Sequence, residues 1–471
     1  MLATPHVHVS GDPAAHLVPG YFFAGPKYDA GAPPAGARIG PEILDAQGRA
    51  VYFDQTPNAG GVRATDVRAQ IYHGKRVLTY WQGGTPKGPD GVQMAGVGSG
   101  SDYILDQNYR VIKTVHGRGY EKGLPITADQ HEFLLTPNNT ALITCYAVTR
   151  RDATAEGGDK NQAVLDGIVE EIDLATSKVV FKWNSLDHVG MKYSKQPMSA
   201  SADSPWDYFH INAVKLDTDK NLIVSSRHTS TIYKVDHRSG RIIWSLSSYN
   251  PKGSSIRALP GVNFSWQHDP EPLGNNTYRI FDNAATTGQN PPPPTSNYSN
   301  VQTVKVDPIA KTATLVGQPI VHSPGVLANS QGNSQALPSG HVMIGWGSTN
   351  RMSEYNAKHQ QIWSGKFDQG FNTYRAYKSP WVGTPGGHPS LTFTGSGSSR
   401  QVDVLWNGAT RVHKWRILGG STRSNVATIA STPWNGLDTA FKLSSYPKYL
   451  RIAAVDAHGH VLAYTNTKST R

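Results

Sequence analysis

The stretch HINAVKLDTDKNLIVSSRHTSTIYKVDHRSGRIIWSL, residues 210–246, decides the fold. It contains four short apolar runs, rich in β-branched residues, and polar turns at 217–220 and 236–240 separate the first run from the second and the third from the fourth. Two such runs joined by a tight polar turn are typical of a β-hairpin. The stretch therefore predicts four consecutive antiparallel strands.

The same four-strand pattern recurs along the chain, which is typical of repeat architectures. Its first strands begin near residues 68, 131, 210, 268 and 333. A half-unit at 40–54 precedes them, and the segment 371–382 can complete it. Five full units and one unit divided between the two ends predict a six-bladed β-propeller, since propellers have ~4–8 blades. Closing the ring in this way removes exposed strand edges.

After residues 383–387 the pattern changes to period-two alternation without the four-strand repeat. Such a region predicts a small immunoglobulin-like β-sandwich. We therefore expect an all-β chain with two domains, a six-bladed β-propeller over residues 1–386 and a C-terminal sandwich over 387–471.

Composition supports this class and excludes others. The chain has 47 Gly and 31 Pro and almost no long stretch at helical spacing, as in β proteins with many turns. Its net charge is +11, but the Lys and Arg are scattered, so we expect a solvated basic surface, with an attraction for small anions as the alternative, and no nucleic-acid partner. Cys145 is the only cysteine, which excludes an intramolecular disulfide. No apolar run approaches the ~20 residues of a membrane span.

One face of the predicted propeller carries the long connections. The turns inside the hairpins are short, whereas long insertions such as 83–100 and 185–209 fall on the opposite face. Loops on a rigid scaffold are where function collects. Each first strand begins on that face, and the residues at or next to these starts are His131, His210, His268 and Asn333.

Second strands run back to the same rim, because they are antiparallel to the first strands. The residues at their ends are Gln82, Tyr146, Arg227, Asn283 and Gly347. Asn212 lies two residues after His210 and so shares its side of the strand. The rim is thus expected to gather three imidazoles, a guanidinium, a phenol and several amides.

Two kinds of chemistry suit this cluster. A lone histidine is usually a packing or surface residue, but three at one register in successive units converge on a channel mouth. They could bind Zn, Cu or Fe, with Asp129 or Asp269 as a further ligand. They could also act on an anionic group, one imidazole attacking while Arg227 and a protonated histidine hold the negative charge. The fixed charge of Arg227 weighs against a metal. No P-loop or dinucleotide glycine pattern is present to hold a nucleotide donor.

Several segments resemble, in order, the arylsulfotransferase family. They are GPEILDAQGRAVYF at 40–53, DQHEF at 129–133, HINAV with NLIVSSRH at 210–228, WQHDPEPL at 266–273 and GNSQALPSGHVMIGWG at 332–347. The resemblance covers about residues 20–382 and is closer to the actinobacterial and fungal branch than to the enterobacterial one, whose cysteine pair a single Cys145 cannot supply.

The resemblance implies a nucleotide-independent, cofactor-free transfer of a sulfuryl group from an aryl sulfate ester to a phenolic acceptor. It implies a ping-pong mechanism with a sulfohistidine on His268. His131, His210, Asn212 and Arg227 match the family's sulfate-binding and acid–base residues. Further substrate-binding candidates on the rim are Asn333, Gln335, Tyr146, Asn283 and Trp81, and Tyr80, Trp206 and Tyr208 could join Trp81 in lining an aromatic acceptor site.

Other interpretations stay open at this point. The chain could be a non-catalytic propeller that binds carbohydrate or protein, or a metal- or quinone-dependent enzyme. Its start, MLATPHVHVSGD, is not an intact signal peptide. Because the resembled family is generally exported, we expect a secreted or periplasmic protein, with a cytoplasmic one as the alternative. The sequence does not predict the oligomeric state.

Overall fold

The structure is a computed structural model that describes residues 4–11, 17–28, 34–57, 61–118, 120–121, 124–125, 127–285 and 296–470. Within these ranges the regular structure is almost entirely β, so the all-β prediction is confirmed. The helical segments there are α1 (Ser185–His188), η1 (Thr154–Glu156), η2 (Met191–Tyr193), η3 (Pro251–Gly253), η4 (Pro338–Gly340) and η5 (Gly397–Ser399). In the described part of the chain, no helix has the length and apolarity to cross a bilayer.

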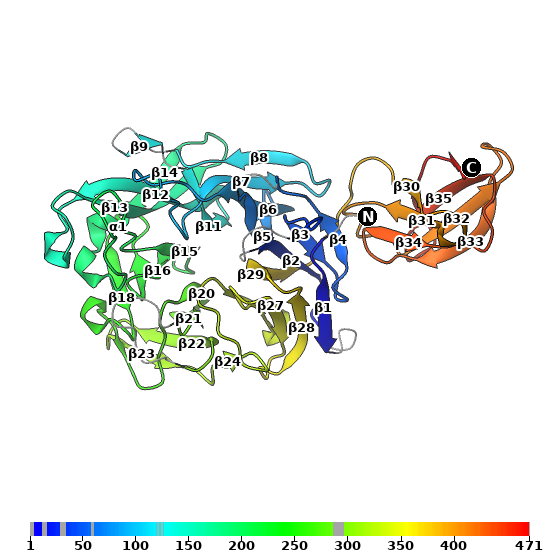
Figure 1. The fold of residues 1–471 in the computed structure, drawn as a ribbon. Helices are drawn as coiled ribbons and strands as arrows, with labels where there is room; N and C mark the ends of the chain where they lie inside the picture. Colours follow the sequence, from blue (N-terminus) through cyan, green and yellow to red (C-terminus); the bar gives the residue numbers. More distant parts are fainter. Residues whose placement is uncertain are drawn as a thin grey trace.

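Most of the chain folds into six antiparallel groups, each built on four strands (Figure 1). The first consists of β29 (Phe371–Ser379), β2 (Tyr21–Tyr28), β3 (Glu42–Leu44) and β4 (Ala50–Phe53). The second consists of β5 (Arg63–Tyr72), β6 (Lys75–Gly84), β7 (Ser99–Leu105) and β8 (Val111–Val115). The third consists of β11 (Thr127–Leu135), β12 (Thr140–Arg151), β13 (Gln162–Asp173) and β14 (Val179–Asn184). A bridge between β11 and β7 joins the second and third groups.

The remaining three groups follow the same order. The fourth consists of β15 (Ile211–Leu216), β16 (Leu222–Ser226), β17 (Thr231–Val235) and β18 (Ile242–Leu246). The fifth consists of β20 (His268–Gly274), β21 (Thr277–Asp282), β22 (Asn300–Asp307) and β23 (Thr312–Leu315), with β19 (Arg257–Ala258) and β24 (Ile320–Val321) added. The sixth consists of β25 (Asn333–Ala336), β26 (Val342–Gly345), β27 (Arg351–Tyr355) and β28 (Gln361–Phe367). The short strands β9 (Tyr120–Glu121) and β10 (Leu124–Pro125) pair with each other.

The first strands of the six groups contact one another in a closed cycle. β29 contacts β5, β5 contacts β11, and the series continues through β15, β20 and β25 back to β29. Figure 1 shows most of these strands facing the middle of the larger body. The inner strands therefore surround a common centre, and polar side chains at their starts can meet there.

Both chain ends take part in closing this cycle. β29, from the C-terminal side, pairs with β2 over Tyr21–Tyr28. The sequence predicted that 371–382 would complete the half-unit at 40–54, but β2 lies between them in the sheet. A second closure was not foreseen: β1 (Val7–Gly11) pairs antiparallel with β28 as a fifth strand.

The C-terminal residues form two further sheets, seen as a separate body in Figure 1. One contains β30 (Ser390–Thr394), β31 (Gln401–Leu405) and β34 (Asp438–Phe441). The other contains β33 (Ala427–Pro433), β32 (Lys414–Gly420), β35 (Tyr449–Val455), β36 (Val461–Tyr464) and β37 (Lys468–Ser469). Their apolar faces share one core, which includes Val402, Trp415 and Ile452. The Asn407 side chain accepts the N–H of Phe53 at 2.9 Å and donates to the carbonyl of Phe53 at 2.7 Å, which connects this body to β4.

Glu42, in β3, provides a test of the burial in the first group. Its side chain is fully buried, and burial raises the pKa of the carboxyl to about 8, although a hydrogen bond to Thr4 lowers it. In the unfolded chain the pKa of this carboxyl is ~4.3. The stability contributed by protonated Glu42 is therefore complete below the unfolded pKa and is lost as the pH rises towards 8.

We expect Glu42→Gln to melt close to the wild type at pH 5 and at a higher temperature than the wild type at pH 8, because the amide has no proton to lose. Thermal unfolding followed by circular dichroism measures this. If the variant and the wild type differ in melting temperature by the same amount at both pH values, the raised pKa of Glu42 is contradicted.

Candidate active site

β-Bulges near the starts of four inner strands change the direction of their side chains. The pairing register shifts in β5, β11, β15 and β20, in each case within the first part of the strand. Asp66, His210 and Asp269 have φ values of 54°, 50° and 47°, a region that non-glycine residues rarely adopt. Bulges of this kind re-aim side chains and are common next to active sites.

A cavity of about 580 Å³ lies where these strands begin. His131, His210 and His268, the three histidines predicted from the sequence, all line it, together with Tyr374 of β29. The His131 and His210 rings lie edge to face with centroids 4.9 Å apart. The ring centroid of Tyr374 lies 5.6 Å from that of His131 and 6.5 Å from that of His268. The structure thus brings the three imidazoles together in one buried site.

The loop between β6 and β7 closes over part of this cavity. Gly96 lies in that loop with φ of +86°, and a Cβ there would lie 2.9 Å from Cε1 of His210. Only glycine combines this backbone conformation with so close an approach. The loop continues with Gly98, whose N–H donates to Asp129 at 2.6 Å. One of the long insertions on the face that carries the long connections therefore helps to form the site.

His268 is held by a neutral amide. Its Nδ1 lies 2.7 Å from Oδ1 of Asn283, which can only accept a hydrogen bond, so Nδ1 carries the proton. The amide orientation follows from its other contacts, because Nδ2 of Asn283 donates to the carbonyls of Ala328 and Gln331 at 2.9 and 3.0 Å. Nε2 of His268 therefore holds a lone pair, and it accepts the backbone N–H of Gln331 at 3.1 Å.

His131 and His210 are held by carboxylates instead. Nδ1 of His131 hydrogen-bonds Oδ2 of Asp129, and Nδ1 of His210 lies 2.5 Å from Oδ2 of Asp207. Burial raises the pKa of Asp207, but His210 and His228 outweigh it and bring that pKa to about 2. Burial lowers the pKa of His210 below its usual range, and the Asp207 carboxylate offsets part of that effect. The three histidines thus differ in the charge of their partners.

Arg227 supplies positive charge next to the histidines. Its guanidinium carbon lies 4.8 Å from the centroid of the Trp266 ring, and Nη2 donates to the carbonyl of Asn329 at 3.1 Å. Burial lowers the pKa of Arg227 to about 10, so the group stays charged at neutral pH. Burial, and then the charge of Arg227, lower the pKa of His268 well below its usual range. His268 is therefore neutral at neutral pH.

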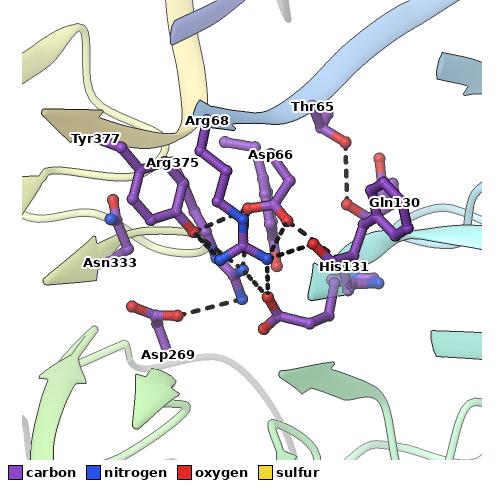
Figure 2. A network of polar contacts seen from close by, with 12 residues as sticks. Thr65, Asp66, Arg68, Gln130, His131, Asp269, Asn333, Arg375 and Tyr377 are labelled. Atoms are coloured by element: carbon purple, nitrogen blue, oxygen red, sulfur yellow. Dashed lines mark hydrogen bonds and ion pairs between the residues drawn. The ribbon is translucent and has the colours of Figure 1, made fainter. Parts of the chain in front are cut away.

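A network of buried charges lies in the channel next to the site (Figure 2). Arg375, which is fully buried, contacts Asp66 at 3.1 Å, Glu132 at 3.0 Å and Asp269 at 3.4 Å. Arg68 contacts Glu132 at 2.7 Å. Lys215 adds contacts of 3.2 Å to Glu132 and 2.6 Å to Asp269. A further cavity of about 630 Å³, lined in part by Arg68, Lys215 and Tyr377, lies against the network without sharing a lining residue with the histidine cavity.

The sequence profile of the arylsulfotransferase (ASST) family matches residues 68–368, which is more than half of the chain. The chain belongs to the arylsulfotransferase family. That membership supports a transferase that acts on aryl sulfates. No curated protein matches the chain.

Solved structures similar to this chain are distant. A protein of unknown function from Bacteroides caccae is 12% identical with a TM-score of 0.41, covering 77% of this chain and 99% of its own. The Cps50 (Swd1) β-propeller domain of Myceliophteria thermophila is 11% identical with a TM-score of 0.31, covering 73% and 92%. A virginiamycin B lyase from Staphylococcus aureus is 8% identical with a TM-score of 0.35, covering 84% and 96%. The functional argument therefore depends on the family and on the site.

Not every residue predicted for the site lines the histidine cavity. Asn212 is fully buried and its Nδ2 donates to the carbonyl of Gln267 at 2.7 Å, so it supports the backbone next to His268. Tyr146 lies 6.4 Å from both His131 and His210, and its hydroxyl donates to the carbonyl of Ile211. Asn212 and Tyr146 therefore lie beside the cavity and do not line it.

Three other predicted substrate-binding residues have different roles. The amide of Asn333 exchanges two hydrogen bonds of 2.9 Å with the backbone of Ala376, and Gln335 does the same with Lys378. These side chains join β25 to β29, because β25 has no bulge to turn them into the channel. Trp81 is buried in a hydrophobic core and donates to the carbonyl of Ala128. None of these three residues lines the histidine cavity, and their contact with substrate stays a prediction.

Sequence reasoning missed four residues that complete the site: Tyr374, Asp207, His228 and Gln331. Tyr374 lies on β29, the inner strand of the first group, and extending the comparison of strand starts into 371–382 would have found it. Asp207 and Gln331 lie in irregular segments, whose geometry no repeat pattern specifies.

One group of described residues lies close enough to share a metal ion. Ligand atoms of Asp207, His210 and His228 lie within 4.8 Å of one another. However, Nδ1 of His210 bonds the Asp207 carboxylate, and Nδ1 of His228 bonds the Asp207 carbonyl at 2.5 Å. Arg227 adds positive charge beside both rings. The arrangement is therefore that of a hydrogen-bonded chain, and the nearby charge disfavours a cation.

Asp207 tests the acid–base role of His210. We expect Asp207→Asn to lower kcat for transfer from an aryl sulfate to a phenol by ~10²–10⁴-fold, because the amide no longer stabilises the imidazolium of His210. Asp203→Asn is the matched control, since Asp203 is 67% exposed and pairs with Arg150 on the surface. Steady-state kinetics measure both variants. If the Asp207→Asn variant keeps the wild-type kcat, the acid–base role of His210 is contradicted.

Proposed function

We propose that the protein transfers a sulfuryl group from an aryl sulfate ester to a phenolic acceptor, without a nucleotide, through a sulfohistidine on His268. In this proposal the six strand groups are the blades of a β-propeller, and the two C-terminal sheets are an immunoglobulin-like sandwich. Membership in the actinobacterial and fungal branch, and export from the cytoplasm, stay predictions.

The observation that carries the proposal is the difference between the partners of the three histidines. His268 bonds a neutral amide, whereas His131 and His210 bond carboxylates. A nucleophile must present a free lone pair, which a neutral imidazole beside Arg227 retains. An acid–base group must gain and lose a proton, which a carboxylate partner assists. The nucleophile is therefore His268, and His131 and His210 are the candidates for proton transfer.

The cavity suits an anionic donor. Lys27 and Arg63 line it as well as the histidines, and no Asp or Glu is among its described lining residues. Arg227 lies close enough to lower the pKa of His268, and a planar guanidinium can give two hydrogen bonds to a sulfate. The ring of Tyr374, between His131 and His268, offers an apolar surface to an aryl group.

In the first half-reaction Nε2 of His268 attacks sulfur as the S–O bond to the aryl group breaks. The leaving oxygen takes its proton from the imidazolium of His131 or His210. The sulfated ring of His268 carries positive charge, and its Nδ1–H continues to donate to Asn283. The N–H of Gln331, which bonds Nε2 here, must turn to another acceptor, and the oxygens of the bound sulfuryl group are such acceptors.

In the second half-reaction the phenolic acceptor loses its proton to the same histidine. Its oxygen attacks sulfur, the N–S bond breaks and the neutral imidazole of His268 is restored. Water has to be kept from competing with the phenol, and the burial of His268 serves this purpose. Donor and acceptor use one cavity in turn, which is the structural basis of ping-pong kinetics.

His268→Asn tests the function. We expect it to abolish transfer from p-nitrophenyl sulfate to a phenol in the absence of nucleotide, because no lone pair remains to attack sulfur. The wild type, given donor alone, should carry one acid-labile sulfuryl group at His268 by mass spectrometry. His73→Asn is the control, as His73 is exposed in the turn after β5.

A His268→Asn variant with wild-type turnover rules out the mechanism. A wild-type protein that binds these compounds without turning them over supports the non-catalytic interpretation instead.

A further inference from the structure

The C-terminal body contains a cavity of its own. Its volume is about 530 Å³, within the ~300–1,000 Å³ typical of small-molecule sites. Residues 383–388, which connect to β30, form one wall, and the loop after β31 together with β35 and β36 forms the others. It shares no lining residue with the histidine cavity.

The lining of this cavity is positively charged. Arg411 and Arg451 both line it, and no Asp or Glu is among its described lining residues. The carboxylate nearest to Arg411 is Asp456, at 3.9 Å, and that carboxylate already accepts the backbone N–H groups of His458 and His460 at 2.9 Å. The charge of Arg411 is therefore only weakly compensated.

Arg451 is held in place without an ionic partner. Its guanidinium carbon lies 4.1 Å from the centroid of the Tyr464 ring, a cation–π contact that stabilises the position of the group. Among the described residues the guanidinium makes no hydrogen bond or ion pair, and its Nε is buried. A half-buried arginine usually has such partners, because removing a charge from water is unfavourable. Its donors are thus available to an anion in the cavity.

Aromatic and apolar groups form the rest of the wall. Trp406 and Tyr464 contribute rings, and Ala409 and Leu462 contribute aliphatic surface. Nε1 of Trp406 has no hydrogen-bond acceptor among the described residues. Rings beside arginines suit a ligand that has a flat or apolar ring and an attached anion, because each part then meets matching chemistry.

We infer that this cavity binds a sulfate monoester of a ring compound. Sulfate presents several acceptor oxygens to the two guanidinium groups, and the ring lies against Trp406 and Tyr464. The ring belongs to an aryl sulfate or to a sulfated sugar, which share this chemistry. The inference does not depend on catalysis at His268, since the cavity is separate. The net charge of +11 favours the approach of such anions.

The experiment measures binding in the full chain that carries His268→Asn, so that no turnover occurs. Isothermal titration with p-nitrophenyl sulfate and with glucose 6-sulfate reports the sites. We expect Arg451→Gln, added to this background, to weaken one binding event by about 10- to 100-fold for at least one of the two probes. A remaining binding event at the histidine cavity should keep its affinity.

Three controls make the result specific. Arg423→Gln removes an exposed arginine of the same body and should leave the isotherm unchanged. Arg451→Lys keeps the charge and should restore part of the binding, which separates loss of the anion contact from unfolding. In the chain with His268 intact, Arg451→Gln should keep the wild-type kcat.

The probe whose binding weakens in Arg451→Gln shows whether the cavity prefers an aromatic ring or a sugar ring. Identical isotherms for Arg451→Gln and its parent with both probes overturn the inference, and so does equal binding of uncharged p-nitrophenyl glucoside. Failure of the catalytic proposal would appear differently, as wild-type transfer rates in His268→Asn.

Discussion

Arg375 connects the inner strands on which the site is built. Its guanidinium contacts carboxylates from β5, β11 and β20 and donates to the carbonyl of Asn212 on β15 at 3.1 Å. Charges buried to this extent are favourable only when they are paired. Burial raises the pKa of Glu132, but Arg375 and Lys215 outweigh it and lower that pKa below its usual range. Each group therefore depends on the others, and replacing one would leave its partners buried and unpaired.

The position of this network explains why the histidines converge. Glu132 follows His131 in the chain, and Asp269 follows His268, so the ion pairs fix the backbone that carries both rings. Bulges at the same part of the strands re-aim the neighbouring side chains. The carboxylates of Glu132 and Asp269 pair with Arg375 and Lys215, whereas the imidazoles line the cavity. The properties of each imidazole depend on the group that its Nδ1 contacts.

The repeated pattern of the sequence predicted both the strands and the positions of the three histidines. Alternating apolar residues and tight turns repeat in each unit, so equivalent positions can be compared without a structure. Asn333 was placed in the site by the same comparison, but its amide bonds the backbone of Ala376 in β29, and β25 lacks the bulge present in β11, β15 and β20. A bulge depends on local backbone geometry and leaves no clear pattern in the sequence.

Other parts of the site depend on contacts between distant segments. Arg375 and Tyr374 come from the strand that closes the ring, far in sequence from the other inner strands. Asp207 and Gln331 lie in irregular connections, and their contacts to His210 and His268 follow from how those connections fold over the rim. Conversely, Asn283 was found from the sequence because it ends a regular strand. Its effect on His268 became clear only from the direction of its amide oxygen.

The central claim is that His268 is neutral, with its proton on Nδ1, because that nitrogen contacts a neutral amide and Arg227 lies nearby, whereas His131 and His210 contact carboxylates. Nitrogen-15 NMR of the full chain with labelled histidine measures the charge and the tautomer of each ring, with single substitutions to assign the signals. We predict that His268 is neutral and protonated on Nδ1 at neutral pH, and that it takes up a second proton only at a lower pH than His210. A His268 that is cationic at neutral pH, or protonated on Nε2 alone, would contradict it.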